Sequence, residues 1–161
     1  MSKSTKLDAS SSLTPLKWSW NQMHDVFEIA FRELVSEHLL KDLLSNYFQL
    51  DIASIVSEHD YWSDAWDGLP RIGISIAIAD DGLKTNVSGY SFQPIADPVL
   101  GDLAKEAAKV FQSEAVIGDF GKHGIEAIGR FLSYLPDGSI WESVDSSDGP
   151  IDDVMPIRRI E

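Results

Sequence analysis

Residues 72–79 read Ile-Gly-Ile-Ser-Ile-Ala-Ile-Ala, and this stretch decides the fold class. Isoleucine occupies every second position, which is the periodicity of a β-strand with one buried face. The alternate positions hold glycine, serine and alanine, whose small side chains let another element pack close to the strand. We therefore expect a strand that is covered on both faces, most simply by a helix on the small-residue face.

The strand is expected to continue into a hairpin. Asp81-Gly82 follows it directly, and this dipeptide is typical of tight hairpin turns. Residues 83–92 would form the returning arm.

A second hairpin is expected near the C-terminus. Pro136-Asp137-Gly138 has the composition of a turn, and residues 131–135 and 139–144 flank it as two strands. A last short strand is expected within 154–160. Pro156 confines that strand to a sheet edge or to a strand start, because proline has no N–H to donate.

Helices are expected before the first strand. Thr14-Pro15 is a good helix start, with threonine as the N-cap and proline in the first turn. Apolar residues then follow at a spacing of three to four, which predicts an amphipathic helix. These residues are Trp20, Met23, Phe27, Phe31 and Leu34. The apolar phase shifts at residues 36–38, so we expect a break there and a second helical piece to about Gln49.

Two further helical segments are expected. Asp51 is placed to cap a short turn through Val56. Asp97-Pro98 begins a longer helix to about Ser113, with leucine, alanine and valine on one side. The order is helices, hairpin, helix, hairpin. The predicted fold class is therefore α+β, in which N-terminal helices and one further helix pack on an antiparallel sheet built from hairpins.

The length and composition set broad limits. The chain has 161 residues, which suits one domain, and we expect residues 14–161 to form it after a disordered tail at 1–13. There is no cysteine, which excludes disulfides and thiolate catalysis. Residues 1–15 lack the apolar core of a secretory signal, and no long uncharged apolar run follows. A cytoplasmic protein is the expectation.

The charge is strongly negative and unevenly distributed. The net charge is −13, which argues against nucleic acid and against anionic membrane surfaces as partners. Residues 42–70 contain six acids and residues 131–157 contain six more, and neither segment contains a Lys or Arg. A surface that serves only solubility usually intersperses both signs. The two segments therefore predict a binding surface for a basic partner.

The first acidic segment ends in a cluster of acids and aromatics. Residues 58–67 contain four acids and three large aromatic residues. Tyr and Trp are frequent anchors of protein interfaces, and carboxylates around them attract an Arg- or Lys-rich protein. Trp62 and Trp66 could instead form the buried stripe of a helix, since they are four residues apart. The predicted partner-binding residues are Glu58, Asp60, Tyr61, Trp62, Asp64, Trp66, Asp67, Asp137, Glu142, Asp145, Asp148, Asp152 and Asp153.

Catalytic and metal-binding motifs are weak in this sequence. His24 and Glu28 lie one helical turn apart, as do Glu33 and Glu37, but a metal site in a helix bundle needs matching ligands on a second helix. We interpret these pairs as a polar helix face exposed to solvent.

Two segments resemble ligand-binding loops only loosely. Asp60, Asp64 and Asp67 do not have the spacing of a calcium loop. Residues 118–124 are rich in glycine but lack the phosphate-loop pattern, so a flexible connector is expected. No catalytic residue, metal or cofactor is predicted, although an unrecognised acid–base site in a small-molecule enzyme stays open.

By its size, its charge and the acidic residues at 58–67 and 137–153, the chain resembles bacterial toxin-immunity proteins as a class. The resemblance implies an intracellular inhibitor that binds a basic toxin, such as a nuclease, with its acidic and aromatic surface. Two further alternatives are a DNA mimic and an accessory protein of a larger assembly. An elongated face of acids would favour the former, and a higher oligomer would favour the latter.

Overall fold

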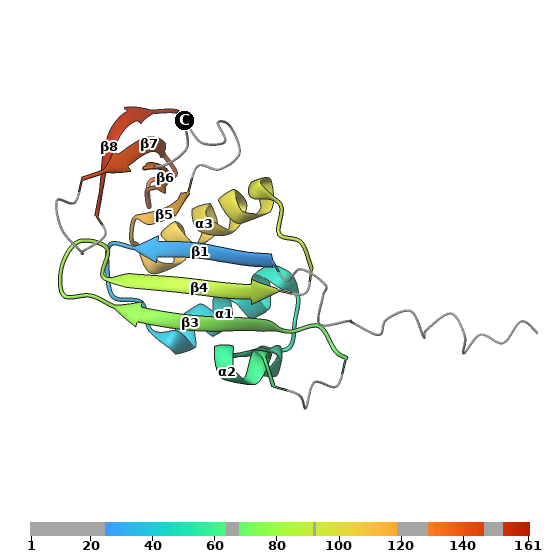
Figure 1. Cartoon of the computed structure of the whole chain (residues 1–161). Coiled ribbons are helices and arrows are strands. Elements are labelled where there is room, and N and C mark those ends of the chain that lie inside the picture. The colour runs from blue at the N-terminus through green and yellow to red at the C-terminus, as the bar shows by residue number, and fades with distance from the viewer. Residues whose placement is uncertain (1–24, 64–67, 92, 119–128, 147–152) are drawn as a thin grey trace, which may run out of the picture.

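The computed structural model describes residues 25–63, 68–91, 93–118, 129–146 and 153–161 (Figure 1). These residues form one eight-stranded sheet in the order β2-β3-β4-β1-β5-β6-β7-β8. Neighbouring strands are antiparallel except β2 and β3. The expected α+β class, with helices on a largely antiparallel sheet, is confirmed.

The strands are β1 (Asp25–Phe31), β2 (Ile55–Ser57), β3 (Ile72–Ile78), β4 (Thr85–Ser91), β5 (Ala115–Gly118), β6 (Arg130–Tyr134), β7 (Ile140–Asp145) and β8 (Val154–Arg159). The helices are α1 (Glu37–Phe48), the 3₁₀ helix η2 (Ile52–Ser54), α2 (Glu58–Tyr61) and α3 (Asp97–Phe111).

The expected helix over residues 14–34 is wrong in its described part, because residues 25–31 form the strand β1. Phe27, Ile29 and Phe31 also alternate with a period of two, so the same side chains fit a strand. As a strand, this segment pairs with β4 on one side and β5 on the other, and it buries all three side chains. The proposed start at Thr14-Pro15 lies outside the described residues.

The β3–β4 hairpin is confirmed around the turn at Asp81-Gly82. The isoleucines of β3 point to the face that carries α1 and α3, although burial fades from Ile72 to the 60% exposed Ile78. On the opposite face of β3, Gly73 is covered closely, since a Cβ atom there would lie 2.6 Å from Tyr61, whereas Ala77 is exposed. The expected cover on both faces is thus confined to the start of the strand.

Helices α1 and α3 lie side by side behind the sheet (Figure 1). The expected second helical piece is confirmed as α1, which Ser36 caps by accepting a hydrogen bond from the Leu39 N–H at 3.2 Å. Asp51 caps η2, as expected, but this turn ends at Ser54 and not at Val56, because Ile55–Ser57 pair with β3 as strand β2. The helix expected from Asp97-Pro98 is α3, which ends at Phe111. The buried side chains of α1 and α3 join Phe27, Ile29 and Phe31 in the main core.

The C-terminal hairpin is also confirmed. Asp137 holds its turn by accepting hydrogen bonds from the backbone N–H and the hydroxyl of Ser139. These bonds lower the pKa of Asp137 below its usual value. Between the arms, the buried hydroxyls of Ser133 and Ser143 lie 2.7 Å apart.

Strand β8 forms the edge that Pro156 predicts. The Asp153 carboxylate accepts from the Val154 N–H, Pro156 has no N–H, and the register with β7 shifts at Glu142/Ser143. Such features discourage the addition of another strand to a sheet edge. A face of the sheet is therefore better suited than this edge to bind a partner.

Candidate functional site

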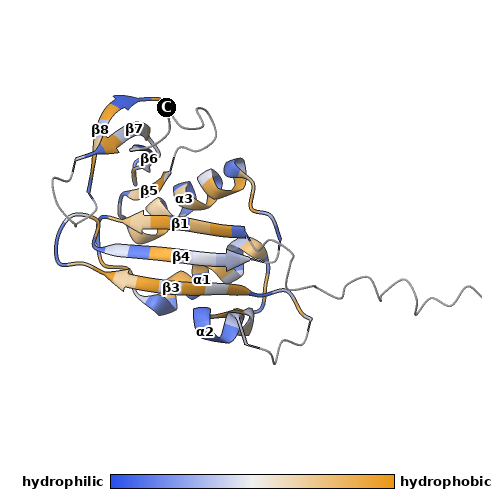
Figure 2. Cartoon of the chain, viewed as in Figure 1, coloured by the Kyte–Doolittle hydropathy of each residue, from blue (hydrophilic) through white to orange (hydrophobic). Residues whose placement is uncertain are grey.

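The site is built on the face of the central sheet that is opposite α1 and α3. Because directly paired residues share a face, the register places three rows there. They are Gly73–Tyr90–Val26, Ser75–Ser88–Glu28 and Ala77–Asn86–Ala30 across β3, β4 and β1. We call this surface the open face. In Figure 2, β4 is the paler, more polar strand between the more hydrophobic β1 and β3.

One end of the open face is covered by the short helix α2. Ser57 caps α2 by accepting from the Asp60 N–H at 3.1 Å. Tyr61 is 1% exposed and packs on Gly73, so glycine is required there for the close approach. Arg71 holds Tyr61 in place, since its guanidinium lies 5.3 Å from the ring centre and donates to the Tyr61 carbonyl oxygen. Helix α2 is thereby fixed over β3.

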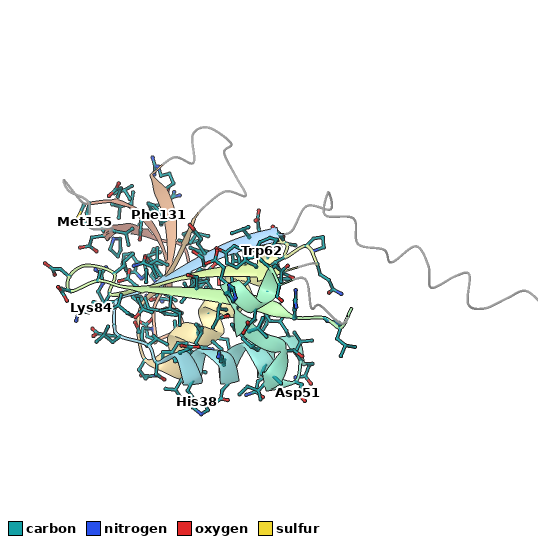
Figure 3. All side chains as sticks on the ribbon, turned by 60° about the horizontal axis from the view of Figure 1, so that its bottom comes forward. His38, Asp51, Trp62, Lys84, Phe131 and Met155 are labelled. Atoms are coloured by element: carbon teal, nitrogen blue, oxygen red, sulfur yellow. The ribbon has the colours of Figure 1, made fainter. Side chains whose placement is uncertain are left out.

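An acidic and aromatic cluster forms where α2 meets β4. Trp62 lies with its ring centre 5.6 Å from that of Tyr90 and 4.9 Å from that of Tyr61, in edge-to-face contacts. Trp62 is 39% exposed, and Figure 3 shows it beside α2 at this end of the sheet. Glu58 accepts a hydrogen bond from the Tyr90 hydroxyl, and the charge of Glu28 also acts on Tyr90. We call Glu28, Glu58, Trp62 and Tyr90 the acidic–aromatic patch.

The surroundings of Tyr61 and Tyr90 raise the pKa of both phenols. Burial raises the pKa of Tyr90, and the hydrogen bond to Glu58 and the charges of Glu58 and Glu28 raise it further. Burial also raises the pKa of Tyr61, which Arg71 offsets in part. Both phenols therefore stay neutral at physiological pH. The negative charge of the patch comes from Glu28 and Glu58.

Glu58→Gln is expected to lower the pKa of Tyr90, because the substitution removes a negative charge beside the phenol. The pKa of Tyr90 is higher in the folded chain than in the unfolded chain. The stability that depends on this difference is therefore fully present below the unfolded pKa of about 10, and it is lost as the pH rises through the folded pKa. NMR titration of ring-labelled tyrosines measures the shift. An unchanged Tyr90 titration would show that Glu58 does not contact the phenol in solution.

A hollow occupies the other end of the open face. Its volume is about 360 Å³. Apolar side chains from five strands and the β3–β4 turn form much of its surface, including the small buried cluster of Leu83, Val116 and Val154. Its carboxylates are those of Glu28, Asp145 and Asp153. Glu28 thus belongs both to the hollow and to the acidic–aromatic patch, and it connects the two.

Arg32 fixes the wall of this hollow. Its guanidinium donates to Glu114 at 2.8 and 3.0 Å, to the Asp153 carboxylate and to the Val154 carbonyl oxygen. Burial lowers the pKa of Arg32, but the bonds to Asp153 and Glu114 outweigh burial and raise it overall. The end of β1 is therefore tied to the start of β5 and to the start of β8. This places Asp153 beside the open face.

The structure separates the two acidic segments predicted to bind one partner. The first lies around β2 and α2, near one edge of the sheet, and the second lies on β6 to β8 at the other edge (Figure 1). The described acids of the two segments do not form one continuous patch. They share the open face, which Glu58 borders at one end and Asp145 and Asp153 border at the other.

The remaining predicted residues have varied positions. Asp60 is exposed on α2, whereas Tyr61 is buried beneath it and supports Trp62. Asp137 stabilises a turn, and Glu142 forms ion pairs with Arg130 and Arg158. The alternative, in which Trp62 and Trp66 form the buried stripe of a helix, can be compared with the structure only at Trp62. Trp62 follows the last residue of α2, Tyr61, and Trp66 lies outside the described residues. The predicted residues outside the described ranges are Asp64, Trp66, Asp67, Asp148 and Asp152.

Sequence reasoning missed Glu28, Tyr90 and Asn86 as members of a site. The helical interpretation of this segment places Glu28 on a stripe that faces solvent. The alternation of Phe27, Ile29 and Phe31 was the available signal, since it places Glu28 on the other face of a strand. Among the described residues, no three His, Asp or Glu side chains come together as metal ligands. The pairs and loops that involve His24, Asp64, Asp67 and residues 119–124 lie wholly or partly outside the described ranges.

The fold and site together define a class: a helix-backed α+β sheet whose other face carries acids, aromatics and a hollow. Comparison with protein-family models, with curated proteins and with solved structures finds no match for this chain. None of the helices in the described residues is long and apolar enough to cross a membrane.

Proposed function

We propose that this protein binds a basic protein partner with the open face of its sheet and neutralises it, as a toxin-immunity protein does. One observation carries the proposal: the acidic–aromatic patch lies on the face of the sheet opposite the two long helices. An exposed tryptophan supported by two tyrosines is a rigid apolar anchor, and Glu28 and Glu58 surround it with negative charge. A surface of this kind favours a partner that presents Lys or Arg.

The carboxylates of Glu28 and Glu58 differ in their ion pairing from Glu142 of the second acidic segment. Glu142 is neutralised by two arginines, and Asp137 is used by its own turn. Glu28 and Glu58 have no ion pair among the described salt bridges, and the described lining of the hollow includes no Lys or Arg. The open face therefore has negative charge to offer an incoming protein.

The proposed mechanism is physical obstruction. The net charge of −13 attracts a basic protein over long range and speeds its encounter with the open face. Trp62 then packs against the partner, and the carboxylates pair with cationic side chains that the partner uses for its own substrate. A nuclease whose phosphate-binding residues are covered in this way cannot bind nucleic acid.

The double variant Glu28→Lys/Glu58→Lys is expected to bind the partner with an association rate about tenfold lower at low salt. The reason is that two attractive charges at the interface become repulsive, and the difference should shrink as salt screens it. The product of the neighbouring gene is the first partner to test. Stopped-flow mixing measures the association rate, and growth during co-expression measures neutralisation.

The matched control is Glu106→Lys, which makes the same kind of charge change on the exposed side of α3. It is expected to slow association only slightly. If Glu106→Lys slowed association per charge as strongly as the double variant, overall charge rather than the open face would govern binding. If the wild-type chain neither bound nor neutralised the partner, the immunity proposal would fail for that protein.

A further inference from the structure

We infer that the hollow on the open face receives a single arginine side chain of the partner. This inference rests on the proposed function and names the contact that anchors it. The hollow lies beside the acidic–aromatic patch and shares Glu28 with it. An arginine there would be held on the same binding face as the aromatic anchor, with Glu28 between the two.

The lining of the hollow matches the two parts of an arginine side chain. The apolar stem needs apolar contacts, which Ala30, Val116 and Phe131 provide from β1, β5 and β6. The planar guanidinium carries five N–H donors and pairs well with carboxylates that approach from different directions. Glu28 approaches from β1, and Asp145 approaches from the end of β7.

The wall of the hollow already binds one guanidinium within this chain. Asp153 accepts from Arg32, whose other nitrogens donate to Glu114. Arg32 thereby orients one carboxylate of the lining and partly neutralises it. Glu28, which also lines the hollow and forms none of the described ion pairs, adds a negative charge that suits a further cation.

The hollow is large enough to admit an arginine side chain. At about 360 Å³, it lies near the lower limit of small-molecule pockets, which begin at roughly 300 Å³. The row that holds Ala30 and Asn86 lies four residues along β1 and β4 from the row that holds Tyr90. That separation is about 13 Å at the usual rise of a strand. A partner can therefore place an arginine in the hollow and a second residue against Trp62.

The test uses three capped tripeptides, Gly-X-Gly, in which X is arginine, lysine or citrulline. Citrulline keeps the shape of arginine but is neutral. The arginine peptide is expected to shift the amide NMR signals of residues around the hollow and to bind at least about tenfold more tightly than the citrulline peptide. Lysine is expected to bind between them, because it offers no planar fork. Equal binding of all three peptides would overturn the inference.

Four variants of the chain, in two matched pairs, locate the binding. Ala77→Leu fills the hollow from an exposed position of β3 without changing any charge, and it should abolish the arginine-dependent shifts. Ala53→Leu, an equal addition at an exposed position of η2, should leave them intact. Glu28→Gln should weaken arginine binding about tenfold, whereas Glu106→Gln should not. Thermal unfolding checks that all four variants are folded.

The two proposals fail in different ways. If Ala77→Leu neutralises the partner as well as the wild type, the arginine pocket is wrong and the open-face proposal stands. If the wild type fails to neutralise the partner but binds the arginine peptide at the hollow, the pocket stands and the immunity role is wrong. Peptide-induced shifts confined to residues of α1 and α3, on the other face of the sheet, would overturn the pocket directly.

Discussion

Gly89→Ala is expected to lower the free energy of unfolding by about 3 kcal/mol, the upper end of the usual cost of overpacking a core. Gly89 pairs with Phe27 across β4 and β1, and the Phe27 ring lies over the glycine. A Cβ atom at this position would lie 2.0 Å from the ring. Phe27 is buried in the main core between the sheet and the helices, so its ring has little room to move.

Urea denaturation measures this loss, and two comparisons identify its cause. In a Phe27→Leu background the same glycine substitution should cost clearly less, because the ring that clashes is absent. Ser88→Thr adds a methyl group to the adjacent residue of β4 on the open face, and it should change stability by no more than about 0.5 kcal/mol. Equal costs of Gly89→Ala with and without the ring would exclude the close packing as the explanation.

Arg32→Met is expected to lower the free energy of unfolding by about 3 kcal/mol, because it leaves a buried carboxylate without its cation. The Glu114 side chain is only 10% exposed, and both of its hydrogen bonds to side chains come from Arg32 through Oε2. Methionine keeps the length of the arginine stem but carries neither charge nor donors. The start of β8 also loses its attachment to β1, so the hollow should widen.

A double-mutant cycle with Glu114→Gln isolates the ion pair. The neutral amide removes the uncompensated charge, so Glu114→Gln should cost less in the Arg32→Met protein than in the wild type. Arg158→Met is the matched control, since Arg158 is 73% exposed and Glu142 keeps Arg130 after the change. Its cost should be no more than about 1 kcal/mol, as is usual for surface ion pairs. Additive effects of Arg32→Met and Glu114→Gln would contradict the proposed coupling.

Local sequence patterns predicted the elements whose hydrogen-bonding partners lie close together in the sequence. The alternating isoleucines with Asp81-Gly82, and the turn at Pro136-Asp137-Gly138, each specify a hairpin within about twenty residues of chain. The capping residue Ser36 was not singled out, but the phase shift of the apolar residues around it correctly placed the break before α1. In each of these elements the hydrogen-bonding partners lie close in sequence, so the pattern and the structure agree.

The first strand shows where local patterns fail. Phe27 and Phe31 fit a helical spacing, and Phe27, Ile29 and Phe31 fit a strand equally well. The choice depends on β4 and β5, which contribute the partners on either side and lie about 60 and 85 residues further along the chain. A reading of the N-terminal segment alone does not contain this information.

By itself, the sequence determined the α+β class, both hairpins, α1 and α3, and the concentration of acids in two segments without Lys or Arg. Only the tertiary structure decided which acids share a surface. It neutralised Glu142 with Arg130 and Arg158, used Asp137 in a turn, and moved Glu28 from a supposed helix to the centre of the open face. The physical reason is that a residue's type alone sets the sign of its charge. The side chains that lie beside it are set by strand pairing between distant parts of the chain.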